Sequence, residues 1–555
     1  MEVDEEEPLL VSSRRTGGLR TLPSIIVNES LERLASSGLS SNMTRYLTGD
    51  YGMSATAASY VLSLWSAASN FTPVIAAFLA DSYVGRYPMI GFGSIICFFG
   101  MLVLWLTAAV PGARNFVVLY TSLALMSIGA GGVRSSSMAF GADQLRKGGR
   151  SLESYVAWYF VSVTASVLVG MSVVVYIQDN MGWTVGFGIP VVLMFLSAVS
   201  FYLSSPFYVK EKPSPSLIAG LLQVAVASYK KRGLRFSSME FDNNNVMYHN
   251  PPGSTHLIPT HRLRFLNRAC IIRNPGTEVS VEGKASDPWS LCSVEQVEGV
   301  KALIRIIPIW SSGIILAVAT TPNAFQYLQV ASMDRHITSN FQVPAGSFAT
   351  FTMIFITIWV PLYDRLLIPL ASKIAGKPVR LNVKLKMGVG IVFMCLSSAV
   401  AGVVESRRRA LAIEQGFSDD PQAVVTMSAF WTLFTQMLGG LAEAFNVIGQ
   451  NEFYLSELPT AMSSIATTLG GLNMFIGNLV ASFILKSVDD LTKGGGKESW
   501  VSTNLNKGHF DYYNWLVCIL NILNLIYFLV CSKGYGPCKG EDDYKDDVSC
   551  GHEFN

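Results

Sequence analysis

The feature that most constrains how this chain can fold is a series of long stretches without a charged residue. Eleven separate stretches of about 18 residues or more contain no Asp, Glu, Lys or Arg. A helix of about 20 apolar residues spans a bilayer, whereas the buried helices of water-soluble proteins are usually shorter. The stretches are continuously apolar rather than alternating, which argues against a membrane β-barrel. We therefore predict an all-α membrane protein whose spans include residues 56–80, 88–110, 115–133, 154–178, 183–207, 306–330, 343–363, 387–404, 421–442, 460–485 and 512–532.

The composition supports this prediction and narrows the possible functions. Half of the 555 residues are hydrophobic and only 14% are charged, whereas soluble proteins carry about 25% charged residues. The eight cysteines are scattered, without the spacing of a disulfide framework or a metal site. No basic patch with interleaved aromatic residues indicates nucleic-acid binding. We therefore expect no enzymatic activity, no cofactor, no metal site and no nucleic-acid partner.

A polar region separates the apolar stretches into two groups. Five stretches precede residue 207 and six follow residue 297. The region between them is too long for a simple connection within a compact domain, so we predict a cytoplasmic linker over 208–297. Within it, Ser216–Arg232 is predicted to form one helix that ends in a basic cluster and could lie at the membrane interface. Lys and Arg favour the loops on the linker's side, which places both termini in the cytoplasm.

The segment that begins NESLER, at Asn28, is polar, but the number of spans requires it in the membrane. Five spans plus six cannot place both termini on the same side. A twelfth span over Ile25–Leu47 resolves this and gives two halves of six helices each, an arrangement found in many transporters. The alternative, a cytoplasmic helix with ordinary surface charges, stays open on residue types alone.

Three charged residues lie on one face of this predicted helix. Glu29, Glu32 and Arg33 follow the i, i+3, i+4 spacing. Ionisable residues at bilayer depth are costly unless they are paired or face water, and they commonly mark ion or proton pathways. A carboxylate that pairs with Arg33 in one state and binds a proton in another would act as a proton switch. We predict that these three residues couple protons to transport.

Two further charges stand in or at the ends of apolar stretches, one in each half. Arg134 follows SIGAGGV, and Glu443 lies within MLGGLAEAFNVIGQ. A salt bridge between them could hold the two halves together at the cytoplasmic side. Equally, each side chain could extend from a helix end to the membrane surface. The run GAGG, residues 129–132, predicts close packing of helices rather than a nucleotide-binding loop.

A short loop, Leu79–Tyr87, connects the second and third predicted spans. Asp81 and Arg86 flank a glycine in it. A tight cytoplasmic loop of this kind suits a hinge between two helices that move together.

These motifs together resemble plant members of the proton-coupled nitrate/peptide transporter family, the proton-dependent oligopeptide transporters of the major facilitator superfamily. ESLER is similar to the family's ExxER signature on the first helix, and FGADQ (Phe140–Gln144) is similar to its motif after the fourth helix. YIQDNMGWTVGFGI, MDRHI, GQNEFYLSELPTAMSSIATTL and NKGHFDYYNWL extend the resemblance over nearly the whole chain. The chain looks closest to the clade of low-affinity nitrate transporters.

The resemblance implies a major facilitator fold and roles for individual residues. Glu29, Glu32 and Arg33 would couple protons to transport, and Arg134 with Glu443 would form the salt bridge between the halves. Many members carry lysine where this chain has Arg134. Arginine keeps the charge but does not readily lose its proton, so it is expected to pair rather than to carry protons. The family's peptide carriers follow ExxER with an aromatic residue and tyrosines, whereas this chain continues with LASSG, which argues against a peptide.

The substrate is less well defined than the class of transport. In the family's dual-affinity nitrate transporter, a histidine on the seventh helix binds nitrate, and the resemblance places Ala319 at the matching position here. Nitrate would then rely on Arg33, Arg134 or donors such as Ser37, Ser41 and Asn323, and many relatives without this histidine carry nitrate. We predict proton-coupled, low-affinity nitrate symport by alternating access. The alternatives are a gibberellin, abscisic acid, a jasmonate or a specialised metabolite as substrate, or a sensor that transports little. The predicted partners are a small anion, protons and membrane lipid, and the oligomeric state is open.

The N-terminus bears on location, and the spans define the predicted domains. In EEEPLL, Glu5 precedes Leu9 and Leu10, similar to an acidic dileucine signal for the vacuole membrane, although we expect the plasma membrane. The predicted domains are an N-terminal tail, a six-helix bundle, the linker, a second six-helix bundle and a C-terminal tail, over residues 1–24, 25–207, 208–297, 298–532 and 533–555.

Overall fold

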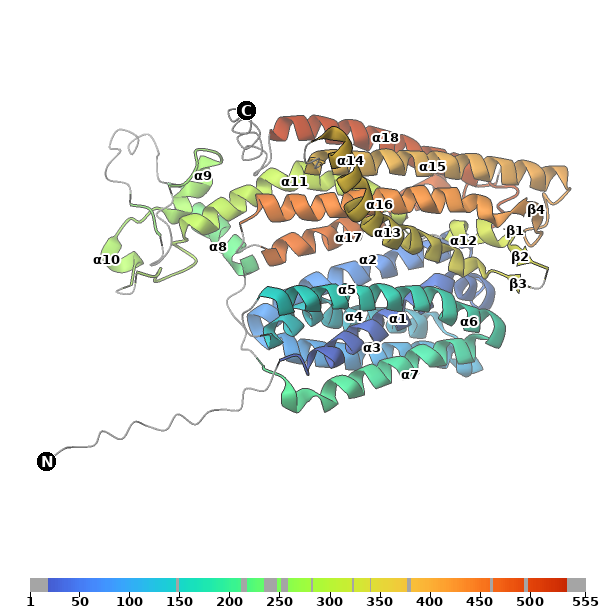
Figure 1. Cartoon of the computed structure of the whole chain (residues 1–555), viewed down its shortest axis with the longest axis horizontal. Helices are drawn as coiled ribbons and strands as arrows, with labels where there is room; N and C mark the ends of the chain where they lie inside the picture. Colours follow the sequence, from blue (N-terminus) through green and yellow to red (C-terminus); the bar gives the residue numbers. More distant parts are fainter. Residues whose placement is uncertain are drawn as a thin grey trace. The chain divides into compact units, whose positions relative to one another are not determined.

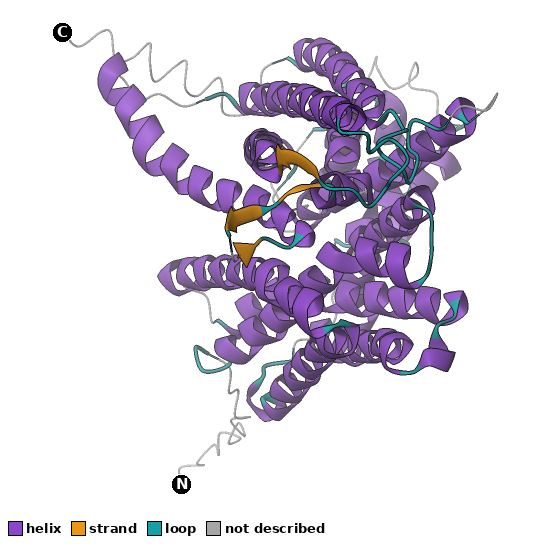
Figure 2. Ribbon diagram, turned by 90° about the vertical axis from the view of Figure 1, so that its right-hand side faces the viewer, coloured by secondary structure: helices purple, strands orange, loops and turns teal. Residues whose placement is uncertain are grey.

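The computed structural model of the chain is mostly helical, with a few very short strands (Figures 1 and 2). The chain forms two compact units. Unit 1 takes its described residues from Met1–Ser40 and Ile75–Ser214, and unit 2 takes them from Ser41–Val74 and Pro215–Asn555. The structure describes residues 18–145, 149–210, 217–233, 247–250, 258–280, 283–321, 324–339, 341–376, 381–459, 463–493 and 498–536.

Ten helical segments among these residues are long and apolar enough to cross a membrane. They are Ala55–Val84, Arg86–Ala109, Phe116–Gln144, Trp158–Met181, Trp183–Phe207, Val294–Ala331, Ala345–Ala375, Val383–Glu414, Thr468–Thr492 and Phe510–Tyr535. Two further long helices, α1 (Leu22–Arg45) and α16 (Thr432–Glu457), carry charged residues within them. With these two, six long helices precede the polar linker and six follow it, which is consistent with the predicted twelve-helix architecture.

Unit 1 is built around the close packing of two helices, α3 (Arg86–Ala109) and α4 (Phe116–Gln144). A Cβ atom on Gly129 of α4 would lie 2.3 Å from the backbone nitrogen of Cys97 on α3, so only glycine fits there. The prediction that the GAGG run packs helices is confirmed. The remaining helices of unit 1 are the first part of α1, the end of α2 (Ala55–Leu79), α5 (Gly149–Val169), α6 (Val175–Met181) and α7 (Trp183–Leu203).

Unit 2 holds the linker helices and the second group of long helices. The linker contributes α8 (Leu217–Lys230), α9 (Arg264–Asn267) and α10 (Pro275–Glu278). The helices that follow are α11 (Val294–Thr320), α12 (Ala324–Ala331), α13 (Thr350–Leu362), α14 (Ile368–Ala375), α15 (Val383–Glu414), α16, α17 (Ser463–Thr492) and α18 (Phe510–Tyr535). The helix predicted over Ser216–Arg232 is thus confirmed as α8, and the predicted domain boundaries stay a prediction.

Short strands and the end of α15 form a small apolar core at one end of unit 2. β1 (Met333–Asp334) pairs in parallel with β4 (Val425–Ser428), and β2 (His336–Thr338) pairs antiparallel with β3 (Phe341–Gln342). With 32 residues, α15 is about 48 Å long, more than the thickness of the hydrocarbon layer. The core is made by side chains that include Val330, Met333, Phe348, Val404 and Val425.

The fourth span of the second half lies further along the chain than the sequence indicated. We predicted it over residues 421–442, but β4 occupies part of that stretch and α16 runs from Thr432 to Glu457. The absence of charge cannot distinguish an apolar strand from a span. The helix continues past charged residues because tertiary contacts, which sequence does not show, surround its polar side chains.

The chain passes from one unit to the other at three points, inside α1, inside α2 and at the start of the linker. Before the division inside α2, this helix packs within unit 2: the ring of Phe71 stacks on Phe475 of α17 with centroids 4.4 Å apart. The Ser59 hydroxyl also accepts a 2.8 Å hydrogen bond from the Ala324 backbone. Pro73 stands beside the division and has no N–H to donate, which weakens the helical hydrogen bonding there.

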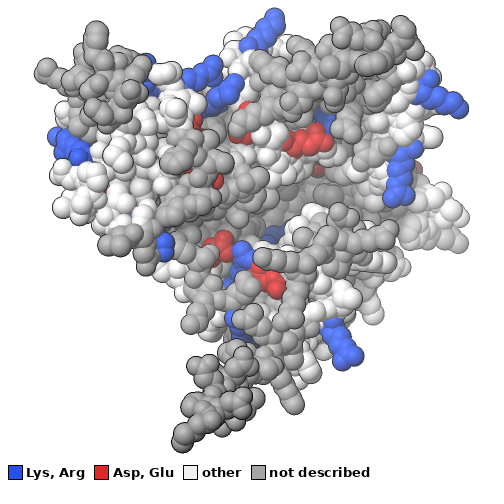
Figure 3. Space-filling view, turned by 60° about the vertical axis from the view of Figure 1, so that its left-hand side comes forward, with Lys and Arg blue, Asp and Glu red and all other residues white. Residues whose placement is uncertain are grey.

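The surface of the molecule carries few charges for its size. In the space-filling view of Figure 3, blue and red side chains are few and scattered among the white atoms of the described residues. Large apolar side chains such as Phe92, Phe195 and Phe483 are more than half exposed on long helices. Their exposure is expected when a bilayer, rather than water, surrounds the helices.

Candidate functional site

The polar face of α1 lies inside unit 1, where neighbouring helices hold it. The Asn28 amide donates hydrogen bonds to the hydroxyls of Ser94 on α3 (3.1 Å) and Ser197 on α7 (2.8 Å). The Ser197 hydroxyl donates back to the Asn28 carbonyl at 3.0 Å. The next residue, Glu29, and Glu32 one turn later are both 0% exposed. The charges of ESLER therefore belong to a buried site and not to a solvated helix face.

Glu29 has one paired and one unpaired carboxylate oxygen. Its Oε1 accepts a hydrogen bond from Arg33 Nε at 2.9 Å, across one turn of α1. Its Oε2 is buried and has no hydrogen-bond partner among the described residues. A buried polar oxygen without a hydrogen-bond partner is costly, because burial removes the water that would otherwise solvate it.

Glu32, in contrast, is fully occupied. Arg134 of α4 binds it with two hydrogen bonds, Nη2 to Oε1 at 2.8 Å and Nε to Oε2 at 3.0 Å. The Ser36 hydroxyl donates to Oε1 at 2.6 Å, and Arg33 Nε stands 4.0 Å from Oε2. Bidentate arginine–carboxylate pairs of this kind are strong and fix the geometry of both groups. Glu32 and Arg134 therefore join α1 to α4.

The four groups together are electrically neutral, and they are not equally enclosed. The two carboxylates are inaccessible, whereas the side chain of Arg33 is 34% exposed and that of Arg134 is 17% exposed. The Nη groups of Arg33 make no hydrogen bond to a described residue. The cluster thus combines a carboxylate oxygen that has no partner among the described residues with an accessible cation one helical turn away.

The predicted salt bridge between Arg134 and Glu443 stays a prediction. The structure pairs Arg134 with Glu32 in its own unit, an interaction that the sequence did not reveal. Glu443 lies on α16 in unit 2, and no described residue of that unit forms an ion pair with it. Glu32 binds Nε and Nη2 of Arg134, so a bridge to Glu443 would either use the remaining N–H groups of the guanidinium or replace Glu32.

The three predicted substrate-cavity residues are placed differently from one another. The Ser37 hydroxyl donates back to the Arg33 carbonyl at 2.6 Å, close to α5 and its following turn. Ser41 also lies on α1 but belongs to unit 2. Asn323 lies outside the described residues, as do Glu5, Leu9 and Leu10 of the dileucine-like segment. The hydroxyl that joins the charged cluster is that of Ser36.

The loop motif forms an ion-pair network that also includes the FGADQ motif. Arg86 Nε pairs with Asp81 at 3.2 Å, and Arg86 Nη1 binds both oxygens of Asp143 at 2.7 and 2.8 Å. Gly85 has φ +90°, a conformation that strongly favours glycine. Asp143 was not predicted as a partner, although it stands inside FGADQ, where its role could have been sought. The network ties the loop before α3 to the end of α4.

The last residue of FGADQ, Gln144, holds the ends of unit 1 together. Its side chain donates to the Val209 carbonyl at 3.0 Å and accepts from the Val209 N–H at 2.8 Å. Its backbone carbonyl accepts a hydrogen bond from Gly18 at 2.9 Å. The motif therefore anchors the segment before α1 and the segment that leads into the linker.

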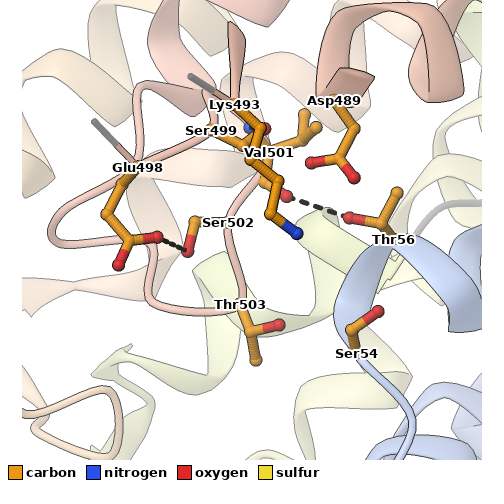
Figure 4. A pocket seen from close by; sticks show the side chains of 9 residues that line it. All are labelled: Ser54, Thr56, Asp489, Lys493, Glu498, Ser499, Val501, Ser502 and Thr503. Atoms are coloured by element: carbon orange, nitrogen blue, oxygen red, sulfur yellow. Dashed lines mark hydrogen bonds between the residues drawn. The ribbon is translucent and has the colours of Figure 1, made fainter. Parts of the chain in front are cut away.

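A pocket of about 300 Å³ lies elsewhere, in unit 2, and shares no residue with the charged cluster (Figure 4). The Thr56 hydroxyl donates to the Val501 carbonyl at 3.0 Å on its wall, and Ser502 donates to Glu498 at 2.9 Å. Lys493 and Asp489 also line it. The lining is polar and holds charges of both signs, so it does not single out an anion.

A second buried ion pair was missed by the sequence analysis. Arg408 of α15 is completely buried, and it binds both oxygens of Glu405 at 2.7 and 2.8 Å. Arg408 Nη1 also donates to Asn506 at 2.7 Å and to Ser332 at 3.3 Å, and Gln329 donates to Glu405 at 2.9 Å. Arg408 stands among three consecutive arginines, a pattern that does not by itself indicate a buried position.

Comparison with known proteins places the chain in a family. The profile described as "PTR2: POT family" matches residues 87–501. Protein NRT1/PTR FAMILY 1.2 of Arabidopsis thaliana is 47% identical over 548 residues, which cover 94% of this chain and 90% of the relative. Protein NRT1/PTR FAMILY 1.1 of the same plant is 46% identical over 553 residues, which cover 95% of this chain and 93% of the relative.

Solved structures show the same fold. An auto-inhibited POT family peptide transporter matches 94% of this chain and 98% of its own, with a TM-score of 0.69 and 17% identity. A POT family transporter in complex with 5-aminolevulinic acid matches with a TM-score of 0.63 and 15% identity. At these identities the likeness concerns the fold alone, and it confirms the predicted major facilitator architecture. From the matched profile and the two Arabidopsis relatives, we conclude that the chain belongs to the POT family of membrane transporters.

Proposed function

We propose that this protein is a symporter that couples protons to the transport of nitrate by alternating access. The observation that carries the proposal is the neutral cluster of two carboxylates and two guanidinium groups, in which Glu29 Oε2 has no partner among the described residues. A proton on that oxygen leaves the cluster with one positive charge. A monovalent anion restores neutrality, which would make binding of the proton and of the anion mutually favourable.

Glu29, rather than Glu32, is the carboxylate that would receive the proton. Both oxygens of Glu32 already accept hydrogen bonds from Arg134, whereas one oxygen of Glu29 is vacant. Protonation of Glu29 would weaken its ion pair with Arg33 and release that guanidinium. A planar guanidinium can bind a planar oxyanion through two parallel hydrogen bonds. One proton per nitrate is electroneutral, and a second proton would make uptake electrogenic.

Arg134 would link this chemistry to the movement of the two halves. It is paired with Glu32 here, and Glu443 in the other half is a second carboxylate that could bind it. We infer that Arg134 exchanges between these two carboxylates as the halves rock. The Asp81–Arg86–Asp143 network would keep the connected ends of α2, α3 and α4 together during this movement.

Uptake into oocytes tests the proposal. Cells that produce the protein are given labelled nitrate, and separate batches are given gibberellin, abscisic acid or a jasmonate, each at acidic and at near-neutral external pH. We expect nitrate uptake above that of control cells, and greater uptake at acidic pH. Nitrate uptake equal to that of control cells at acidic pH would reject nitrate as the substrate.

The same assay separates the alternatives. Acid-stimulated uptake of a hormone, without nitrate uptake, would support a hormone or metabolite carrier, a reading favoured by the apolar Ala319 at the position of the family's nitrate-binding histidine. Nitrate binding to the purified protein without uptake of any compound would support a sensor. Fluorescent fusions of the full chain would decide between the plasma membrane, which we propose, and the vacuole membrane.

A further inference from the structure

Helix α8 of the linker has two apolar faces, and only one of them is covered. On the covered face, Val224 and Ala227 are 0% exposed and pack with residues of α9, the following turn and the start of α11. On the other face, Leu222, Val226 and Tyr229 are 57%, 37% and 67% exposed. These three follow the i, i+4, i+7 spacing, so they form one stripe along the helix. A second apolar face on a linker helix needs a partner.

Cations border the C-terminal end of this stripe. The Lys230 side chain is 48% exposed and stands 3.5 Å from Asp287, an exposed carboxylate. The Arg232 guanidinium lies 4.4 Å from the centroid of the Tyr229 ring. An aromatic ring and basic side chains beside an apolar stripe are typical of helices that lie in a membrane interface. The charge is opposite to that of anionic lipid headgroups.

The position of α8 also suits a membrane surface. Gly220 of α8 lies against the first turn of α11, where its Cβ would be 3.5 Å from Gln296. Leu221 packs on a cluster that includes Ile306 of α11 and Tyr535 at the end of α18. α8 and α11 lie side by side in Figure 1. Since α11 and α18 are both long enough to cross the membrane, α8 packs where spans emerge from it.

We propose that α8 lies flat on the membrane leaflet next to the linker and binds anionic lipid. Leu222, Val226 and Tyr229 enter the boundary between headgroups and acyl chains. Lys230 and Arg232 reach the lipid phosphates, with their aliphatic stems along the apolar stripe. The linker is thereby held on the bilayer beside unit 2. The proposal does not depend on the substrate or on proton coupling.

Spin-label accessibility in proteoliposomes tests this placement. The full chain carrying Val226→Cys is labelled with a nitroxide and reconstituted in vesicles of phosphatidylcholine with phosphatidylglycerol. Collision rates are measured with oxygen, which concentrates in lipid, and with a water-soluble nickel complex. The chain without the added cysteine, treated in the same way, supplies the background. Ser286→Cys, at an exposed linker position outside α8 and its apolar stripe, is the matched control.

We expect the label at position 226 to collide several-fold more with oxygen than with nickel, and the label at position 286 to show the reverse. Replacing phosphatidylglycerol with phosphatidylcholine, or adding salt, should raise the nickel accessibility at position 226. High nickel accessibility at position 226 in anionic vesicles would overturn the proposal. Low accessibility to both reagents would also overturn it, because it would mean that another protein segment or a second copy covers the stripe. Tyr229→Cys provides a second position along the stripe if labelling at 226 fails.

Discussion

Each unit of this transporter buries a cluster of acidic and arginine side chains, but only one of the two clusters is saturated. In unit 2, Arg408 and Glu405 are both inaccessible, and Gln329, Ser332 and Asn506 satisfy them further. In unit 1, the cluster of Glu29, Glu32, Arg33 and Arg134 leaves one carboxylate oxygen vacant and both arginines partly exposed. The residue types are the same, and the difference lies in how completely their hydrogen bonds are filled.

This difference indicates two different roles. In the ion pair of Arg408 and Glu405, every guanidinium nitrogen and both carboxylate oxygens have a hydrogen-bond partner, so no atom is left vacant for a proton or a ligand, which indicates a structural role. An incompletely occupied cluster costs free energy in its resting state, and that cost is removed when a proton or an anion binds. Occupancy, and not burial or charge, is therefore the property on which we base the proposed functional role of the unit 1 cluster.

The largest expected effect comes from breaking the saturated cluster. In Arg408→Met, the Glu405 carboxylate loses its bidentate partner in a fully buried position. Removal of one member of a buried ion pair costs about 3–5 kcal/mol, so the free energy of unfolding should fall by that amount. Thermal unfolding of the purified protein, followed by tryptophan fluorescence, measures this loss. Arg33→Met is the matched variant and should lower stability much less, because Arg33 is partly exposed and Glu29 can take up a proton. Equal losses in both variants would contradict the distinction.

The next effect is a loss of coupling in the unsaturated cluster. A difference of one pH unit stores about 1.4 kcal/mol per proton, enough for about tenfold accumulation of substrate. In Glu29→Gln, the neutral amide mimics the protonated acid, so this accumulation should vanish while substrate exchange across the membrane continues. Glu32→Gln should also lose accumulation, because an amide has only one oxygen and cannot accept both hydrogen bonds from the Arg134 guanidinium. Transport assays in proteoliposomes with an imposed pH gradient measure both processes. Normal accumulation in Glu29→Gln would show that its vacant oxygen is not the proton site.

The smallest expected effect concerns how the Arg33 guanidinium would bind nitrate. Lysine in Arg33→Lys keeps the charge but cannot form two parallel hydrogen bonds to a planar oxyanion. We expect a loss of about 1 kcal/mol, or about fivefold in apparent nitrate affinity, with acid stimulation retained. Concentration-dependent nitrate uptake measures it. Unchanged affinity in this variant would place the anion away from Arg33.

Much of the fold follows from the sequence, because a bilayer imposes length and apolar character on each span. The apolar runs identified most of the spans. An even number of spans is needed to place both termini on one side of the membrane, and this requirement predicted α1 as a span although it contains charged residues. The fourth span of the second half was predicted too early in the sequence. Hydropathy included the apolar strand β4 in the span and left out the polar, buried second half of α16.

The sequence singled out the four residues of the charged cluster, but it did not predict that Glu32 pairs with Arg134. Helical spacing placed Glu29 and Arg33 together, since one turn separates them. The contact between Glu32 and Arg134 depends on which helices are neighbours, and no spacing within one helix gives that information. Helical spacing also places Glu405 and Arg408 together, but it does not show that they are buried, because Ser332 and Asn506 come from other parts of the chain.

The division of α1 and α2 between the units has a consequence for any attempt to separate the halves. A chain cut within the linker would yield an N-terminal fragment that keeps residues 41–74, whose packing partners in unit 2 would be on the other fragment. The second fragment would lack the surface against which Phe71 and Ser59 pack. Neither fragment is a complete folding unit, so the two would have to be produced together and assemble through this shared hairpin. Residues 41–74 thus come before most of unit 1 in the sequence but fold as part of unit 2.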